Sequence, residues 1–251
     1  MKNLFIIGAQ RSGSTMFAKT LDLHPKIKLI TPIKPEPKYF LDRNYDGKQT
    51  YLDLLKKFKG NFDYFLEKSV SYIEHDDALS RINCDFPDAK ILVILREPVN
   101  RCWSNYKYSV ENGIEKRGFS EAIKNSNELD FDSNISVNPF AYVKRGFYDK
   151  YLEKVFNIFH KKNIKVIIHE EFISSTESLY NIFEWLNLQK INIPKNIFIN
   201  KINKTSSEYL NLESLNELTH LYTDSVLRLE NLIGTKIDPW RELWRARGIR
   251  I

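Results

Sequence analysis

The stretch LFIIGAQRSGST, residues 4–15, constrains the fold of this chain more than any other part of the sequence. The continuously apolar segment 2–8, which ends in glycine, predicts a buried strand. The segment 15–23 predicts a helix that ends before Pro25. A strand, a glycine-bearing loop and a helix in this order direct backbone N–H groups and the positive end of the helix at an anion. The sequence therefore predicts an anion-binding loop in an α/β protein.

The loop has the glycine spacing of a nucleotide-binding P-loop but lacks its lysine. Ser14 and Thr15 directly follow Gly13, and the only cation in the loop is Arg11. Phosphate binding is still expected, because the amides and hydroxyls remain. Hydrolysis of a nucleoside triphosphate is not, because it needs the lysine and a metal-binding acid. A plain structural corner with a solvated Arg11 is the alternative.

A second segment, ILVILREPVNRCWSNY, adds a cation and a hydroxyl. Its apolar part 91–95 predicts a strand followed by Arg96, Pro98 suits the first turn of a helix, and Ser104 lies within that helix. Open α/β sheets bind ligands outside the carboxyl ends of their strands. An arginine fork and a hydroxyl at that place suit a terminal phosphate.

Strand and helix signals alternate along the rest of the chain. Further strands are expected at 27–30, 64–68 and 164–169, and further helices at 49–58, 76–83, 147–160, 175–186 and 214–232. This alternation predicts one domain over 1–251, with a central, mostly parallel sheet between two layers of helices. The segment 113–140 is expected to be a loop or lid.

Composition narrows the classes of partner. The net charge is +6 over 251 residues and the pI is about 9.1, which favours anionic ligands. No basic run or recognition module indicates nucleic acid, and no apolar run approaches the ~18 residues of a membrane span. Cys84 and Cys102 lack a metal or redox spacing. We therefore expect no metal, no nucleic acid, no membrane span and a cytoplasmic location.

The two phosphate segments resemble motifs of the sulfotransferases that use 3′-phosphoadenosine 5′-phosphosulfate (PAPS). IIGAQRSGST is similar to their 5′-phosphosulfate loop and ILVILREPVNRCWSNY to their 3′-phosphate motif. KPEPKYFLD and LEKSVSYIEH are similar to segments of the heparan-sulfate-type branch, and INKTSSEYLN resembles a loop that closes over the nucleotide. The resemblance covers about 4–240. It implies a P-loop-like three-layer fold and PAPS as co-substrate, with 3′,5′-bisphosphoadenosine as product and no metal requirement.

The resemblance also implies a set of donor-binding residues. Arg11 would contact the bridging and leaving-group oxygens, and as an arginine it stabilises charge without donating a proton. The implied donor-binding residues are Gly8, Gln10, Arg11, Ser12, Gly13, Ser14 and Thr15 for the 5′-phosphosulfate, Arg96 and Ser104 for the 3′-phosphate, and Lys201, Lys204 and Thr205 for closure.

Two side chains are candidates for the general base. Glu36 lies in a proline-flanked stretch and matches the acidic base position of the heparan-sulfate-type branch, whereas His75 has the more suitable ordinary pKa. Lys68 matches a lysine at the reacting centre, although Val70 stands where proline is usual. The alternatives are a solvated loop carboxylate, a surface helix start and a surface lysine. The other histidines are expected to be structural or on the surface: His24, His160, His169 and His220.

The sequence thus predicts transfer of a sulfuryl group to a hydroxyl or amine of a carbohydrate or small metabolite. A small-molecule kinase and a non-catalytic nucleotide- or polyanion-binding module remain as alternatives. The segments 38–62 and 113–145 are expected to line the acceptor cleft, and the absence of an anchor suggests a bacterial or cytosolic member. Five cations hint at a polyanionic acceptor: Lys107, Lys116, Arg117, Lys144 and Arg145. Trp240 and Trp244 are expected to pack as a C-terminal tail.

Overall fold

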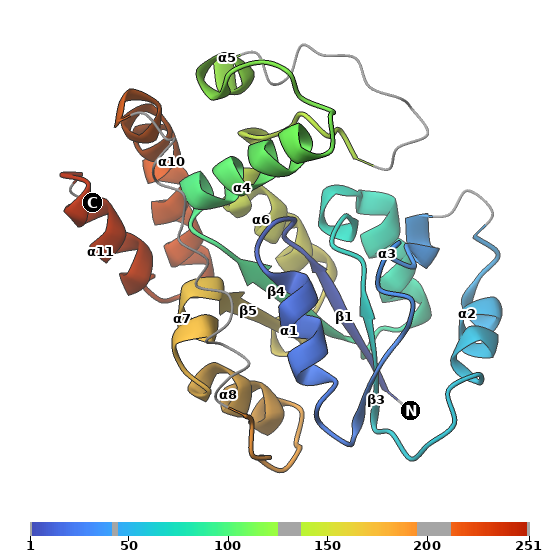
Figure 1. The fold of residues 1–251 in the computed structure, drawn as a ribbon. Coiled ribbons are helices and arrows are strands. Elements are labelled where there is room, and N and C mark those ends of the chain that lie inside the picture. Colours follow the sequence, from blue (N-terminus) through green and yellow to red (C-terminus); the bar gives the residue numbers. More distant parts are fainter. Residues whose placement is uncertain (1, 42–44, 125–136, 195–211, 250–251) are drawn as a thin grey trace.

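A five-stranded, wholly parallel sheet is the centre of the fold (Figure 1). The computed structural model describes residues 2–41, 45–124, 137–194 and 212–249. The strands are arranged in the order β2-β3-β1-β4-β5. Their bounds are Lys2–Gly8 (β1), Ile27–Leu29 (β2), Tyr64–Lys68 (β3), Lys90–Leu95 (β4) and Ile164–Ile168 (β5). The predicted parallel α/β sheet is confirmed.

Helices flank the sheet, and the predicted helices have their expected bounds within a few residues. Three short helices were not predicted: Phe119–Lys124, His169–Ser174 and Asp238–Ala246. A helix, α5, lies inside the segment predicted as a loop, because Phe119, Ala122 and Ile123 form an apolar face that packs on Trp103 and Tyr106. The helices are α1 Ser14–Leu21, α2 Lys48–Leu55, α3 Asp76–Asp85, α4 Pro98–Glu111, α5 Phe119–Lys124, α6 Tyr148–Ile158, α7 His169–Ser174, α8 Glu177–Trp185, α10 Leu212–Ile233 and α11 Asp238–Ala246.

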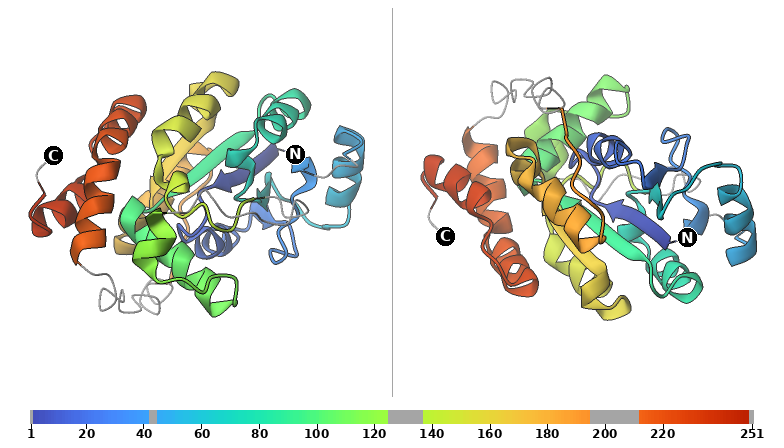
Figure 2. Two further views of the ribbon diagram at one scale, coloured as in Figure 1. Left: turned by 90° about the horizontal axis from the view of Figure 1, so that it is seen from above. Right: turned by 90° about the horizontal axis from the view of Figure 1, so that it is seen from below.

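The central strands are buried on both faces and divide the core in two. Leu4 and Ile6 of β1 face the cluster that contains α1, α7 and α8. Phe5 and Ile7 face the opposite cluster, where α3, α6, α10 and α11 pack. Successive side chains of a strand point to opposite faces, so a continuously apolar strand serves two cores. In Figure 2, α10 and α11 lie together at one end of the molecule and α2 at the other.

The topology brings the chemically distinctive segments to one edge of the sheet. In a parallel sheet all carboxyl ends lie at the same edge. Lys68 ends β3, the loop 9–13 follows β1, and Arg96 follows β4, and these three strands are neighbours. In the part of the chain that the structure describes, no helix is both long and apolar enough to cross a bilayer.

Candidate active site

The loop between β1 and α1 is curled into an anion-binding shape. Arg11 and Gly13 both have left-handed backbone conformations, with φ of 64° and 82°. Such residues turn successive N–H groups toward one concavity, and α1 begins directly afterwards at Ser14. A β-carbon on Gly8 would lie 2.8 Å from the Ile73 side chain, so only glycine fits where the loop leaves the strand.

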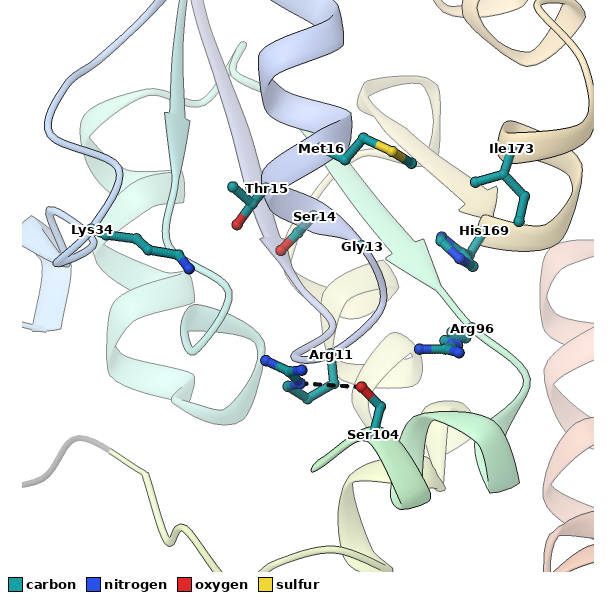
Figure 3. Close-up of a pocket in the computed structure, with 10 residues that line it drawn as sticks. All are labelled: Arg11, Gly13, Ser14, Thr15, Met16, Lys34, Arg96, Ser104, His169 and Ile173. Carbon is teal, nitrogen blue, oxygen red and sulfur yellow. Dashed lines mark hydrogen bonds between the residues drawn. The ribbon is translucent and has the colours of Figure 1, made fainter. Parts of the chain in front are cut away.

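A cavity of about 350 Å³ lies in front of this loop (Figure 3). The structure brings six of the predicted donor-binding residues together around it. Four further lining residues were not predicted. The predicted residues are Arg11, Gly13, Ser14, Thr15, Arg96 and Ser104, and the others are Met16, Lys34, His169 and Ile173.

The cavity is strongly cationic. The Nε of Arg11 donates to Ser104 Oγ at 3.3 Å, and its guanidinium carbon lies 4.6 Å from the centroid of the Tyr108 ring. Burial lowers the pKa of Arg11, and the positive charge of Arg96 lowers it further. The third cation is Lys34, and no carboxylate is among the described residues that line the cavity. An anionic ligand would relieve the repulsion among these charges.

His169 is a functional candidate that the sequence analysis missed. Its ring packs against the loop so closely that a β-carbon on Gly13 would lie 2.7 Å from His169 Nδ1. Burial, reinforced by the charge of Arg96, lowers the pKa of His169 to about 4, so the imidazole is neutral at neutral pH. Within the described residues Nδ1 is buried without a hydrogen-bond partner. Its place directly after an apolar strand was the sequence signal for this role.

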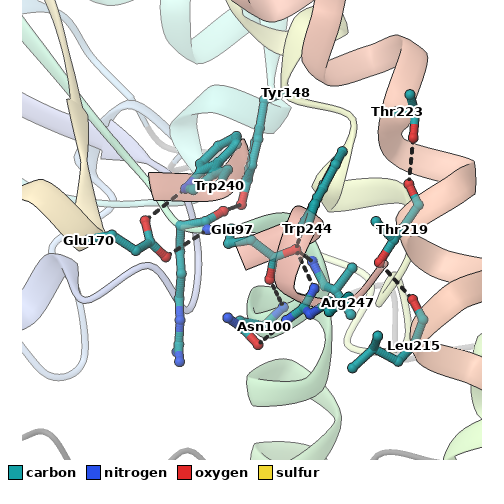
Figure 4. Close-up of polar contacts among 12 residues, drawn as sticks. Glu97, Asn100, Tyr148, Glu170, Leu215, Thr219, Thr223, Trp240, Trp244 and Arg247 are labelled. Carbon is teal, nitrogen blue, oxygen red and sulfur yellow. Dashed lines mark hydrogen bonds and ion pairs between the residues drawn. The ribbon is translucent and has the colours of Figure 1, made fainter. Parts of the chain in front are cut away.

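Two carboxylates, the buried Glu97 and the half-buried Glu170, hold the chain behind Arg96 (Figure 4). The backbone N–H of Glu97 donates to Glu170 Oε1 at 3.0 Å, and Trp240 Nε1 donates to Glu170 Oε2 at 2.8 Å. Trp244 Nε1 donates to Glu97 Oε1 at 2.7 Å. The tryptophans of α11 therefore pack inward, as predicted, and they also fix the strand end that carries Arg96.

Glu97 is in addition the N-cap of α4. Its carboxylate accepts from the backbone N–H groups of Val99 at 3.2 Å and Asn100 at 2.7 Å. Arg247 Nη1 lies 3.2 Å from Glu97 Oε1. A capping carboxylate stabilises the unpaired N–H groups of a first helical turn. The helix that carries Ser104 is thus anchored at the same point as Arg96.

Lys68, the last residue of β3, forms an ion pair with Glu36. Lys68 is 2% exposed and its Nζ donates to Glu36 Oε1. Glu36 Oε2 accepts from the backbone N–H of Val70 at 3.0 Å. A proline at position 70 would have no N–H to donate, so the departure from the usual motif adds a contact. The alternatives of a surface lysine and a freely solvated carboxylate are wrong.

Other predicted residues lie elsewhere. Gly8 ends β1 and Gln10 and Ser12 belong to the loop, but none of the three lines the cavity, and the Ser12 side chain is fully buried. His75 is the N-cap of α3 and does not line it either. The predicted closing residues lie outside the described residues: Lys201, Lys204 and Thr205.

Two of the five cations expected to face a polyanionic acceptor are engaged by carboxylates of the chain. Arg145 is 3% exposed and its Nε donates to Glu74 at 2.8 Å. Arg117 Nη2 donates to Glu115 at 2.7 Å. Both side chains stabilise the segment around α4 and α5, so this part of the expectation is wrong. No group of three metal-ligating side chains is found within the described ranges.

Comparison with known proteins places these features in a family. The profile of the sulfotransferase family matches residues 28–191. Human heparan sulfate glucosamine 3-O-sulfotransferase 3B1 is 28% identical over 199 residues, which cover 78% of this chain and 48% of that protein. The chain thus spans about half the length of the curated relatives it matches first.

Solved structures share the fold. A sulfotransferase from Alicyclobacillus acidocaldarius superposes with a TM-score of 0.77 at 25% identity, covering 96% of this chain and 99% of the other. A mouse sulfotransferase complexed with PAP superposes with a TM-score of 0.61 at 13% identity, covering 97% and 88%.

Proposed function

Because the chain belongs to the sulfotransferase family, we propose that it transfers the sulfuryl group of PAPS to a hydroxyl or amine of a carbohydrate. The observation that carries the proposal is the cationic cavity in front of the loop after β1. A cavity whose lining combines backbone N–H groups, three cations and no carboxylate among the described residues suits a ligand with several anionic groups.

The donor has two anionic ends, and the cavity offers two groups of ligands. The loop amides, Thr15 and Arg11 would hold the 5′-phosphosulfate, as expected for a nest at a helix start. Arg96 and Ser104 would hold the 3′-phosphate, which distinguishes PAPS from ATP. Since Ser104 Oγ accepts from Arg11 in the structure, its hydroxyl hydrogen remains available for a phosphate oxygen.

The transfer itself needs a base and a charge stabiliser. The acceptor oxygen attacks sulfur, the bond between sulfur and the 5′-phosphate oxygen breaks, and the acceptor proton moves to the Glu36 carboxylate. The leaving 3′,5′-bisphosphoadenosine carries away the bonding electron pair, and Arg11 would stabilise that charge. Lys68, paired with Glu36, would both orient the base and neutralise charge at the reacting centre. Neither Glu36 nor His75 lines the cavity. Glu36 suits the role of base better, because its carboxylate is held by Lys68 and the Val70 N–H, whereas His75 is the N-cap of α3.

The carbohydrate acceptor is supported by the relatives. Those matched first are named for heparan sulfate glucosamine, and we extend a glycan acceptor to this chain on that basis. A degenerate kinase is not favoured, because the residue that follows β4 is Arg96, where a metal-binding acid would be needed. The contacts that hold the Glu36 carboxylate, from Lys68 Nζ and the Val70 N–H, likewise speak against a non-catalytic binding module.

Calorimetric titration with 3′,5′-bisphosphoadenosine tests the donor site, with 5′-AMP and ATP·Mg²⁺ as controls. We expect micromolar binding that requires the 3′-phosphate. Preference for ATP·Mg²⁺ would contradict the proposal. The acceptor is then sought by transfer of labelled sulfate from PAPS to desulfated heparan chains and to free amino sugars.

A further inference from the structure

A buried carboxylate next to Lys68 has no part in the chemistry described so far. Glu67 is 0% exposed and lies on the face of β3 opposite to Lys68, toward the core that contains Phe65 and Phe40. Burial raises the pKa of Glu67. A buried acidic side chain is costly unless it is hydrogen-bonded, so its position calls for a reason.

Two hydroxyl groups converge on one oxygen of Glu67. Ser69 Oγ donates to Glu67 Oε1 at 2.9 Å, and the Tyr72 hydroxyl donates to the same oxygen at 2.5 Å. Both hydroxyl-bearing residues are buried, at 0% exposure. Each hydroxyl has a single hydrogen. Because that hydrogen is donated to Glu67, the lone pairs of each hydroxyl oxygen point in a fixed direction.

Those lone pairs hold the segment that follows Glu36. The backbone N–H of Lys38 donates to Ser69 Oγ at 2.9 Å, and that of Phe40 donates to the Tyr72 hydroxyl at 3.1 Å. Two hydrogen-bonded chains thus run from one carboxylate oxygen to two backbone groups, two and four residues beyond Glu36. The carboxylate of Glu36 is held separately, by Lys68 Nζ and the Val70 N–H.

We propose that Glu67 is a positioning residue, which sets the place of Glu36 through the Ser69 and Tyr72 hydroxyls. The segment 30–38 has no helix or strand of its own and would otherwise depend on the two contacts of the carboxylate itself, with Lys68 Nζ and the Val70 N–H, to aim Glu36. Misplacement of a catalytic group by about 1 Å can cost about 10²-fold in rate. This inference rests on the proposed role of Glu36 as the base.

The first test is kinetic. S69A and Y72F each remove one hydroxyl and E67L removes the shared acceptor, whereas E67Q keeps a carbonyl acceptor. We expect kcat for sulfate transfer to fall at least tenfold in E67L and in the S69A/Y72F double variant. The KM for PAPS and the Kd of 3′,5′-bisphosphoadenosine should stay within twofold, and E67Q should retain most of kcat. D149N is the matched control, because Asp149 is a buried carboxylate that accepts from the Ser225 hydroxyl between α6 and α10.

The second test does not need an acceptor. Amide hydrogen exchange should lose protection at Lys38 in S69A, at Phe40 in Y72F and at both in E67L, with both retained in E67Q. Unchanged protection in a folded E67L variant, or an unchanged kcat in the double variant, would overturn the inference. If E36Q itself keeps full kcat, Glu36 is not the base and the proposed function needs another one. The exchange data do not depend on that result, because they test only the hydrogen bonds to Lys38 and Phe40.

Discussion

Two strand ends in this protein each pair a functional cation with a neighbouring buried carboxylate, and they do so differently. At the end of β4, Glu97 follows Arg96 and accepts from Trp244 and Arg247, so its partners include a cation. At the end of β3, Glu67 precedes Lys68, and the partners of its Oε1 are two neutral hydroxyls.

The difference between the partners of Glu97 and Glu67 matches what the ends of β4 and β3 must each hold in place. The β4 edge is anchored by packed tryptophans of a C-terminal helix and presents Arg96 to the cavity from a rigid base. The β3 edge holds a segment without regular structure through oriented hydroxyls. We infer that the first arrangement secures the affinity for the donor and the second secures the rate of transfer, and the following variants separate the two.

The largest effect is expected on the rate side. E36Q removes the proton acceptor but keeps the size of the side chain. General base catalysis contributes typically 10²–10⁴-fold, so we expect a fall of about that size in kcat. The Kd of 3′,5′-bisphosphoadenosine should be unchanged. Steady-state kinetics and calorimetry measure the two quantities, and a kcat within threefold of wild type would refute Glu36 as the base.

The next largest effect is expected on the affinity side. R96A removes charge-assisted hydrogen bonds to the 3′-phosphate, each worth about 1.5–3 kcal/mol. We therefore expect the Kd of 3′,5′-bisphosphoadenosine to rise about 10- to 10²-fold by calorimetry, with little change for 5′-AMP. R245A, a change at an exposed arginine of α11, serves as the control. Equal losses for both nucleotides would place Arg96 away from the 3′-phosphate.

A third variant tests the contact between the loop and His169, the first residue of α7. G13A places a methyl group 2.7 Å from His169 Nδ1 at a position with φ of 82°, so we expect weaker binding of 3′,5′-bisphosphoadenosine, by about tenfold at a strain of about 1–2 kcal/mol. The G13A/H169A double variant should recover part of the affinity, because the clash is removed while the backbone strain remains. If the changes in binding free energy of G13A and H169A simply add in the double variant, the His169 ring and the loop contribute to binding independently.

Much of this architecture is predictable from the sequence, because local signals and the global fold agree at the strands. The apolar run before Gly8 and the strand before Arg96 have the bounds expected of buried parallel strands, and parallel topology alone brings their carboxyl ends together. His169 was not predictable in the same way. Its place directly after an apolar strand is a local signal, but its contact with Gly13 joins the start of α7 to a loop that lies 156 positions earlier, and no local pattern encodes that pairing.

The errors arise where contacts form between residues that no local pattern links, or where an element is short. As arginines, Arg145 and Arg117 were expected on a basic surface. The sequence does not show that they pair with Glu74 and Glu115 in the folded protein. The helix α5 was missed because six residues are too few for a clear period. Lys68 was correctly singled out, yet its burial depends on Glu36, 32 residues away.

A fourth variant separates stability from rate on the β4 side. W244F removes the indole N–H that donates to Glu97 Oε1, and this oxygen keeps the Val99 and Arg247 donors. We expect the free energy of unfolding to fall by about 1 kcal/mol, as for one lost hydrogen bond, with kcat unchanged. Urea denaturation measures this, and W185F is the control, since Trp185 Nε1 donates to a carbonyl near the surface. A loss of kcat in W244F that exceeds the loss of donor affinity would undo the division between the two edges.

A further prediction is a pH dependence that belongs to the donor side. The pKa of His169 is lowered to about 4 in the folded protein, against an ordinary value of about 6.5. As the pH falls from about 6.5 toward 4, the unfolded chain takes up a proton that the folded protein does not, so the contribution of His169 to the free energy of unfolding declines. Above that window the contribution is constant. H169Q should lose this dependence, and H160Q, a change at an exposed histidine, should keep it.

Ligand binding should shift the pKa of His169 in the opposite direction. A phosphate beside His169 offsets the charge of Arg96, which lowers the pKa of the imidazole, and the bound anion therefore raises that pKa. Binding of 3′,5′-bisphosphoadenosine near pH 5 should then be accompanied by proton uptake, and its affinity should increase a few-fold between pH 7 and pH 5. Calorimetry in two buffers of different ionisation enthalpy measures the uptake directly. Equal uptake in wild type and H169Q would assign the proton to another group and leave His169 a packing residue of the loop.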